Sequence, residues 1–260
     1  MHVFCFDFDG VICDSAPETA LAAWAVCAQL WPEFSGPLPD SARGRFCRLR
    51  PVMLTGWEAI PLMRLAATSG NPDERILADF PALRDGIMAA HGLSSADLRL
   101  RFGAVRDAMV ARDEDAWVRL NPFYAGMAEL LAETMRRHEV FIITTKQERF
   151  TSLLLRRRGV PVEGGRVFGL ERDLPKPAIL EELLRRPGLA GRTFHFIEDR
   201  LETLEEVRAI PLLAAVRLAL ADWGYNTPAQ RQRAASAGIE VVALPRLRAL
   251  CRSESDDKSG

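Results

Sequence analysis

The chain has 260 residues, of which 34 are basic and 35 acidic, so its net charge is −1. A nearly neutral chain lacks the positive charge that attracts nucleic acid or a membrane surface, and we expect neither as a partner. No apolar run is long enough to cross a bilayer, and Asp7 and Asp9 interrupt the apolar N-terminus, unlike a signal peptide. Five cysteines without a CxxC pair favour reduced thiols and a cytoplasmic location.

The first predicted element is a buried strand over 3–8, an apolar run with Asp7 near its end and Asp9 directly after it. Residues i and i+2 of a strand point to the same side, so the two carboxylates are expected to converge on one point. Converging carboxylates repel unless a cation lies between them, and a hard divalent ion such as Mg²⁺ prefers oxygen ligands. A solvated strand end is the less favoured interpretation, because the flanking residues are apolar.

A helix is predicted over about 17–31, with Ser15 as its N-cap and Glu18 completing a capping box. Up to about residue 120 the sequence then shows helical patterns, at 73–91 and 95–119, separated by clusters of proline and glycine. No convincing strand occurs in this part of the sequence. It is predicted to be a helical insertion over 16–120.

From residue 121 onward, predicted helices alternate with predicted strands. The strands are expected at 140–144, 166–169, 193–197, 216–220 and 239–244, and the helices at 124–138, 147–158, 177–186, 201–209 and 228–237. This alternation is typical of an α/β fold with a parallel sheet covered on both faces. Residues 1–15 and 121–250 are therefore predicted to form the α/β domain, followed by a disordered polar tail over 251–260.

Function in such sheets is found at the carboxyl ends of the strands. Asp7 and Asp9, Thr144, and the pair Glu198-Asp199 all fall at the carboxyl ends of three different predicted strands. Because these ends meet at one edge of a parallel sheet, the side chains are expected to form one site.

Lys176 lies between two prolines, directly before a predicted helix. Together with the residues above, it gives an ordered set of four short motifs. The motifs are Asp7-x-Asp9-Gly10-Val11, the strand end at Thr144, Leu174-Pro175-Lys176-Pro177, and Glu198-Asp199. The set resembles the haloacid dehalogenase (HAD)-like hydrolase superfamily over residues 1–15 and about 121–245. The resemblance implies a Rossmann-like core, with the helical insertion as a cap domain of the phosphatase branch.

The resemblance also implies a role for each residue of the motifs. Asp7 would be the nucleophile that forms an aspartyl-phosphate, and Asp9 the general acid and base. Thr144 and Lys176 would bind the phosphoryl group. Mg²⁺ would be held by the Asp7 carboxylate, the Asp9 backbone carbonyl and Asp199, with Glu198 as a further candidate ligand.

Several assignments remain open at the level of sequence. Thr145 competes with Thr144 for the hydroxyl role, Lys146 competes with Lys176 as the cation, and Glu202 is a substitute for a later acid of the family. The segment Asp222–Thr227 either borders the site or is a plain turn with an N-cap, which is the favoured interpretation. Four arginines of the insertion either meet an anionic substrate or form a solvated face; they are Arg43, Arg45, Arg48 and Arg50.

The residues also discriminate among the reactions of the superfamily. Related dehalogenases lack the second aspartate, whereas Asp9 is present here. Phosphonate-cleaving relatives need a cap lysine, and residues 16–120 contain none. We therefore expect a Mg²⁺-dependent phosphatase acting on a small soluble phosphate monoester. Two functions are less favoured. One is a phosphotransferase similar to the sugar phosphomutases, which use a cap-side histidine and lysine that the helix after Asp9 lacks. The other is a non-catalytic HAD-like binding or regulatory protein.

Overall fold

The computed structural model describes residues 1–68, 70–160 and 162–252. The chain divides into two compact units, which we call the sheet unit, Met1–Asp14 with Phe123–Gly260, and the helical unit, Ser15–Pro122. The sequence pattern predicts the corresponding boundaries after residues 15 and 120. Each unit has a hydrophobic core of its own.

The described part of the sheet unit holds a six-stranded sheet in which every neighbouring pair is parallel, in the order β3-β2-β1-β4-β5-β6. The strands are β1 (His2–Phe6), β2 (Glu139–Ile143), β3 (Val167–Phe168), β4 (Thr193–Glu198), β5 (Arg217–Ala221) and β6 (Glu240–Val242). The prediction of an α/β fold with a parallel sheet is thereby confirmed. In the register, Phe6 pairs with Ile142 on one side and Ile197 on the other, so the carboxyl ends of three central strands lie level.

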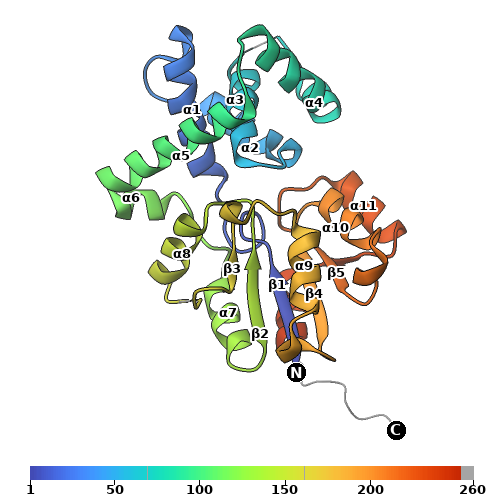
Figure 1. Ribbon diagram of the computed structural model, residues 1–260. Helices are drawn as coiled ribbons and strands as arrows, with labels where there is room; N and C mark the ends of the chain where they lie inside the picture. The colour runs from blue at the N-terminus through green and yellow to red at the C-terminus, as the bar shows by residue number, and fades with distance from the viewer. Residues whose placement is uncertain (69, 161, 253–260) are drawn as a thin grey trace. The chain divides into compact units, whose positions relative to one another are not determined.

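Helices connect the strands and cover the sheet (Figure 1). They are α7 (Met127–Met135), α8 (Glu148–Arg157), α9 (Lys176–Leu184), α10 (Leu201–Arg208), α11 (Pro228–Ser236) and α12 (Leu244–Arg252), with 3₁₀ turns at Leu170–Arg172, Pro187–Leu189 and Pro211–Leu213. The apolar sides of α9, α10 and α11 pack on one face of the sheet, against residues such as Val3, Cys5 and Phe196. Burial of the strands between layers of helices explains why β1 and β4 are apolar almost throughout.

The helical unit contains no strand in its described residues, as its sequence predicts. Its helices are α1 (Ala16–Leu30), α2 (Asp40–Leu49), α3 (Ala59–Ala67), α4 (Asp73–Ala90), α5 (Ser95–Arg112) and α6 (Glu114–Arg119), with 3₁₀ turns at Pro32–Phe34, Arg50–Val52 and Gly56–Glu58. Trp24, Phe46 and Phe102 are among the buried side chains of its core. Pro81 lies inside α4, which departs from helical geometry at Asp79, because proline removes a helical hydrogen bond and crowds the preceding turn.

Three predictions about local structure are wrong. The single helix expected over 95–119 breaks at Asp113, whose carboxylate accepts a hydrogen bond from Ala116 N and so caps α6. Ser15 makes no capping hydrogen bond, and Glu18 turns away from its own helix to bind Arg106. The first two residues of the tail predicted over 251–260 are helical, since α12 extends to Arg252. The remainder of that predicted tail, 253–260, lies outside the described residues.

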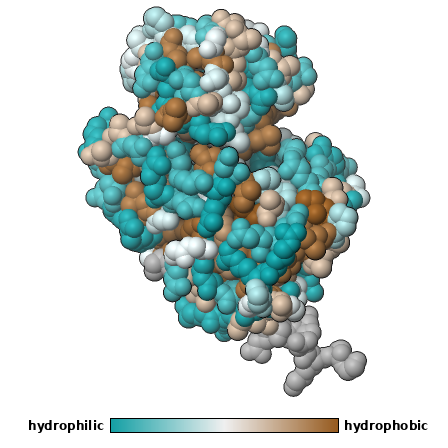
Figure 2. Space-filling model, viewed as in Figure 1, coloured by the Kyte–Doolittle hydropathy of each residue, from teal (hydrophilic) through white to brown (hydrophobic). Residues whose placement is uncertain are grey.

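The surface seen in Figure 2 mixes hydrophilic and hydrophobic residues. Among the described residues, no helix combines the length and the apolar character that a membrane span requires. No disulfide joins the five cysteines, all of which lie in the described part of the chain.

Candidate active site

Asp7 follows β1 directly and lies at the centre of the sheet's carboxyl edge. Its backbone N–H donates to Ile197 O of β4 at 2.9 Å, which continues the ladder one residue beyond the assigned strand. Asp7 is only 4% exposed. A carboxylate is thus held in the interior, where an unpaired charge is costly.

Lys176 supplies the opposite charge, as the first residue of α9. Its Nζ lies 2.6 Å from Asp7 Oδ1 and 2.7 Å from Glu198 Oε2. Burial alone would lower the pKa of Lys176, but the charges of Asp7 and Glu198 raise it above its usual value. The ammonium therefore stays charged between the two carboxylates.

Glu198, the last residue of β4, is occupied by donors on both oxygens. Oε2 accepts from Lys176, and Oε1 accepts from the backbone N–H groups of Asp199 and Arg200 at 3.1 Å each. Burial raises the pKa of Glu198 to about 7, although Lys176 opposes the rise. Burial likewise raises the pKa of Asp7 to about 7, the charge of Glu198 adds to the rise, and Lys176 counteracts it.

Asp199 completes an acidic cluster with Asp7 and Glu198, in which one ligand oxygen from each residue lies within 4.8 Å of the others. Asp199 Oδ1 is buried and has no hydrogen-bond partner among the described residues. Burial raises the pKa of Asp199, and the charge of Asp7 contributes to the rise. Three clustered carboxylates, of which Lys176 pairs with two while Asp199 Oδ1 has no partner among the described residues, fit a hard divalent cation such as Mg²⁺.

Asp9 is not one of the three residues of this cluster, but, together with burial, its charge contributes to raising the pKa of Asp7. The convergence of the two carboxylates on one point stays a prediction. The assigned strand ends at Phe6 and the chain bends at Phe8, so both aspartates lie beyond the regular strand. Asp9 Oδ1 lies 3.0 Å from Nζ of Lys146, whose side chain is fully buried. The sequence left Lys146 and Lys176 as alternatives for the cation of the site. In the structure each lysine pairs with a different aspartate, Lys146 with Asp9 and Lys176 with Asp7.

Thr144 follows β2 and is buried, whereas the competing Thr145 is exposed. The backbone N–H of Thr144 donates to Phe168 O, and its Oγ1 accepts from the backbone N–H of Lys146 at 3.1 Å. Since a hydroxyl both accepts and donates, Thr144 can still donate its O–H hydrogen while it accepts from Lys146.

Glu202 and Arg45, both of which the sequence left as candidates, are engaged in contacts outside the acidic cluster. Glu202 accepts hydrogen bonds from Arg200 and from Gln230 of α11. Arg45, in the helical unit, pairs with Asp73 and donates to the backbone carbonyls at the end of α3. This arginine serves the local fold of its unit.

The four histidines of the chain show no metal-ligand spacing in the sequence. The structure brings three of them together: His2 Nδ1 lies 3.2 Å from His195 Nε2, and the backbone N–H of His2 donates to His138 Nδ1 at 3.3 Å. His195 stacks on Phe4 with ring centroids 4.7 Å apart. The cluster lies on β1, β4 and the start of β2, and the spacing of these residues in the sequence carries no signal of the contact.

The fold is an α/β fold with a parallel sheet, and it is similar to that of haloacid dehalogenase-like proteins of known structure. No model of a protein family matches the sequence, and neither does any curated protein. Comparison with solved structures identifies the fold, and the resemblance drawn from the four motifs is confirmed at that level.

The similar structures match almost the whole chain at low sequence identity. A haloacid dehalogenase-like hydrolase from Streptococcus pneumoniae is 15% identical, with a TM-score of 0.58 over 96% of this chain and 97% of that one. A predicted phosphatase from Clostridium acetobutylicum is 14% identical, with a TM-score of 0.60 over 96% and 97%. A predicted phosphoglycolate phosphatase from Haemophilus somnus is 14% identical, with a TM-score of 0.57 over 96% of both chains.

Proposed function

We propose that this protein is a Mg²⁺-dependent phosphatase that hydrolyses a small phosphate monoester through an aspartyl-phosphate on Asp7. The observation that carries the proposal is the environment of Asp7, a buried carboxylate 2.6 Å from Lys176 Nζ. It clusters with Asp199, whose buried Oδ1 has no hydrogen-bond partner among the described residues. The similar structures described as phosphatases support the same reaction class.

In the first step, an oxygen of Asp7 attacks phosphorus and the bond from phosphorus to the ester oxygen breaks. Asp9 donates its proton to the departing oxygen, so the alcohol leaves neutral. In the second step, Asp9 takes a proton from a water molecule, whose oxygen attacks phosphorus and releases inorganic phosphate and the Asp7 carboxylate. Thr144 and Lys176 hold the phosphoryl oxygens and balance their charge.

The metal would be held by the carboxylates of Asp7 and Asp199 and by the backbone carbonyl of Asp9. Glu198 is within reach of the same position, but its oxygens already accept from Lys176 and two backbone N–H groups. We therefore assign Glu198 to positioning Lys176. When bound, Mg²⁺ supplies positive charge to the clustered carboxylates and to the phosphoryl oxygens.

The helical unit would serve as the cap, which excludes water from the reacting phosphate and selects the substrate. The predicted cap at 16–120 corresponds to this unit, Ser15–Pro122. A chain of net charge −1 fits a small anionic substrate in the cytoplasm better than a nucleic acid or a membrane.

The test is hydrolysis of 4-nitrophenyl phosphate in Mg²⁺ by the wild type and by Asp7→Asn. We expect Asp7→Asn to lose at least about 10³-fold in kcat, because an amide oxygen is a poor nucleophile. Asp85→Asn, at an exposed position of the helical unit, is the matched control and should keep the wild-type rate. Wild-type turnover by Asp7→Asn with an unchanged far-UV circular dichroism spectrum would refute the nucleophile.

The covalent intermediate has a separate test. A nitrophenolate leaves without much help from an acid, whereas the water in the second step needs a base. Asp9→Asn should therefore accumulate protein carrying one phosphoryl group after acid quenching, detectable by mass spectrometry of the intact chain. An unchanged steady-state rate in Asp9→Asn would contradict its assignment as acid and base.

A further inference from the structure

The turn after β5, residues Trp223–Asn226, contacts the loops that follow β1 and β4. The sequence favours a plain turn with an N-cap for this stretch. Thr227 does cap α11, where it forms a capping box with Gln230. The four residues before it, which we call the brace, have contacts that a turn and a cap do not require.

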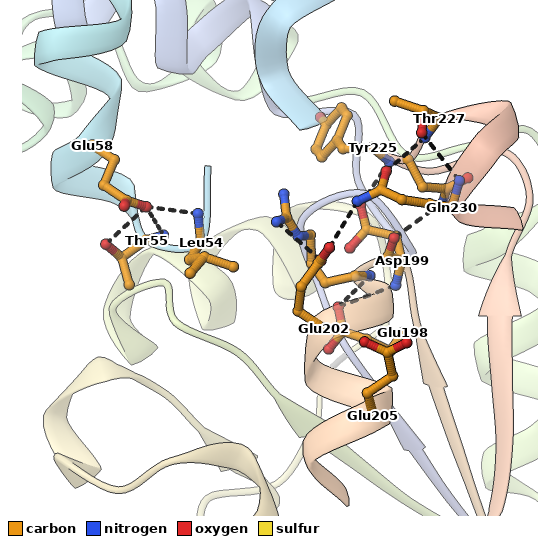
Figure 3. Close-up of polar contacts among 12 residues, drawn as sticks. Leu54, Thr55, Glu58, Glu198, Asp199, Glu202, Glu205, Tyr225, Thr227 and Gln230 are labelled. Atoms are coloured by element: carbon orange, nitrogen blue, oxygen red, sulfur yellow. Dashed lines mark hydrogen bonds and ion pairs between the residues drawn. The ribbon is translucent and has the colours of Figure 1, made fainter. Parts of the chain in front are cut away.

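The brace holds Asp199 through hydrogen bonds to its side chain and its backbone. The backbone N–H of Tyr225 donates to Asp199 Oδ2 at 2.7 Å, and the two residues face each other in Figure 3. The buried Asn226 Nδ2 donates to Asp199 O at 3.0 Å and to Ala221 O at 2.8 Å. One carboxylate oxygen is thereby fixed, while the buried Oδ1 has no hydrogen-bond partner among the described residues.

Two glycines make this close approach possible. A Cβ on Gly224 would lie 2.7 Å from Gly10 O and would also collide with the side chain of Asp199. A Cβ on Gly10, which has φ of +94°, would lie 2.6 Å from Asp199 Cγ and 2.8 Å from Tyr225 Cδ2. The loop after β1, the carboxylate of Asp199 and the brace therefore touch at positions where only glycine fits.

The brace also binds the loop after β1 through two side chains. Trp223 Nε1 donates to Val11 O at 3.1 Å, and Tyr225 OH donates to Asp14 Oδ1 at 2.8 Å. The same four residues thus fix the loop that carries Asp7 and Asp9 and the loop that carries Asp199.

We propose that the brace is a positioning device for the metal site, which sets Asp199 Oδ1 relative to the loop after β1 and thereby sets the affinity for Mg²⁺. The inference rests on the proposed function, since it presumes the metal site at Asp7 and Asp199. None of the four brace residues needs to touch the metal. Groups that orient a ligand in this way commonly change metal affinity by about 10- to 100-fold when they are replaced.

The experiment is a calorimetric titration of Mg²⁺ into chelator-treated full-length protein, which measures binding without activity. Gly224→Ala should raise the Kd for Mg²⁺ about tenfold or more, because its methyl group displaces Asp199. Asn226→Ala should weaken Mg²⁺ binding to a similar degree, and Trp223→Phe should weaken it by a smaller factor. If Gly224→Ala does not fold, these two variants test the inference. The matched control is Gly188→Ala, whose new Cβ would meet nothing within 4 Å.

Asp199→Asn serves as the reference for loss of the ligand itself. Loss of Mg²⁺ binding in Asp199→Asn, with weakened binding in the brace variants and a normal Gly188→Ala, supports the inference. If Asp199→Asn loses binding while folded brace variants bind Mg²⁺ within about twofold of the wild type, the brace is wrong and the proposed function stands. If Asp199→Asn binds Mg²⁺ normally, the metal site and the brace are both wrong.

Discussion

The two units both bury charged side chains, but they balance the charges differently. In the helical unit, Arg106 of α5 donates to both oxygens of Glu18 at 2.9 and 2.6 Å, and Trp117 Nε1 donates to one of them at 3.1 Å. In the sheet unit, three carboxylates cluster, one lysine ammonium pairs with two of them, and Asp199 Oδ1 has no hydrogen-bond partner among the described residues.

The difference separates a structural ion pair from a site that needs a ligand. One guanidinium and one carboxylate of the helical unit cancel each other's charge, and every oxygen of Glu18 has a donor, so nothing is left to bind. The acidic cluster gathers three buried carboxyl groups, and burial raises the pKa of each because ionised carboxylates are disfavoured in the interior. Breaking the ion pair in the helical unit should therefore lower the stability of the fold. Breaking the acidic cluster in the sheet unit should instead weaken metal binding.

The largest effect is expected in the helical unit, where Glu18→Ala leaves the guanidinium of Arg106 buried without its carboxylate. Loss of one partner of a buried pair costs about 3–5 kcal/mol. Urea denaturation followed by far-UV circular dichroism should show that decrease in the free energy of unfolding. Asp40→Ala, which breaks an exposed pair with Arg43, is the control and should cost less than about 1 kcal/mol.

The pair as a whole has a second test. Replacing both partners, as Glu18→Leu with Arg106→Met, should recover most of the stability lost in Glu18→Ala, because a buried pair and an apolar pair of similar volume are often nearly equivalent. A double variant as unstable as Glu18→Ala would show that the buried site requires the charges themselves.

Glu18 also shows where sequence reasoning stops. Its position three residues after Ser15 predicts a capping box, but its partner Arg106 lies 88 residues away, and no local pattern encodes that contact. Asp7, Thr144 and Glu198 were predictable as neighbours because the carboxyl ends of parallel strands share one edge. The pairing of Lys146 with Asp9 and the contacts of the brace were not predictable, since both join loops that are far apart in the sequence.

The next effect is the stabilisation of the folded protein by Mg²⁺ binding at the acidic cluster. A ligand at 100 times its Kd that binds only the folded state stabilises that state by about 2.7 kcal/mol. Wild-type protein should gain about this much on addition of Mg²⁺ in urea denaturation, and chelation should reverse the gain. Asp199→Asn should gain nothing, and an equal gain in that variant would place the stabilising ion elsewhere.

After the ion pair and the acidic cluster, His195 is a third case, an ionisable side chain that is buried in its neutral form. Burial lowers the pKa of His195 to about 3, with His2 and Arg217 contributing. Below about pH 6.5 the unfolded chain takes up a proton that the folded chain refuses, so stability is lost as the pH falls from about 6.5 toward 3. Between about pH 6.5 and pH 5 this loss amounts to about 2 kcal/mol.

The measurement compares urea denaturation of the wild type and of His195→Phe at about pH 7 and pH 5. His195→Phe keeps the ring stacked on Phe4 and should lose about 2 kcal/mol less than the wild type on acidification. His91→Gln, at an exposed position, should keep the full acid sensitivity. Equal losses in the wild type and His195→Phe would mean that His195 takes up its proton in the folded protein.

The smallest effect distinguishes the two lysines within the site. Lys146 contacts Asp9, the proposed acid, whereas Lys176 contacts Asp7, the proposed nucleophile. Lys146→Met should lower kcat/KM for an alkyl phosphate about tenfold more than for 4-nitrophenyl phosphate, because only the alkoxide needs a well-oriented acid to leave. Lys176→Met is the matched comparison and should lower both values by the same factor, since both esters require the same attack at phosphorus. Equal losses of kcat/KM for the two esters in Lys146→Met would mean that this lysine does not orient Asp9 toward the leaving group. The separate roles assigned to the two lysines would then be wrong.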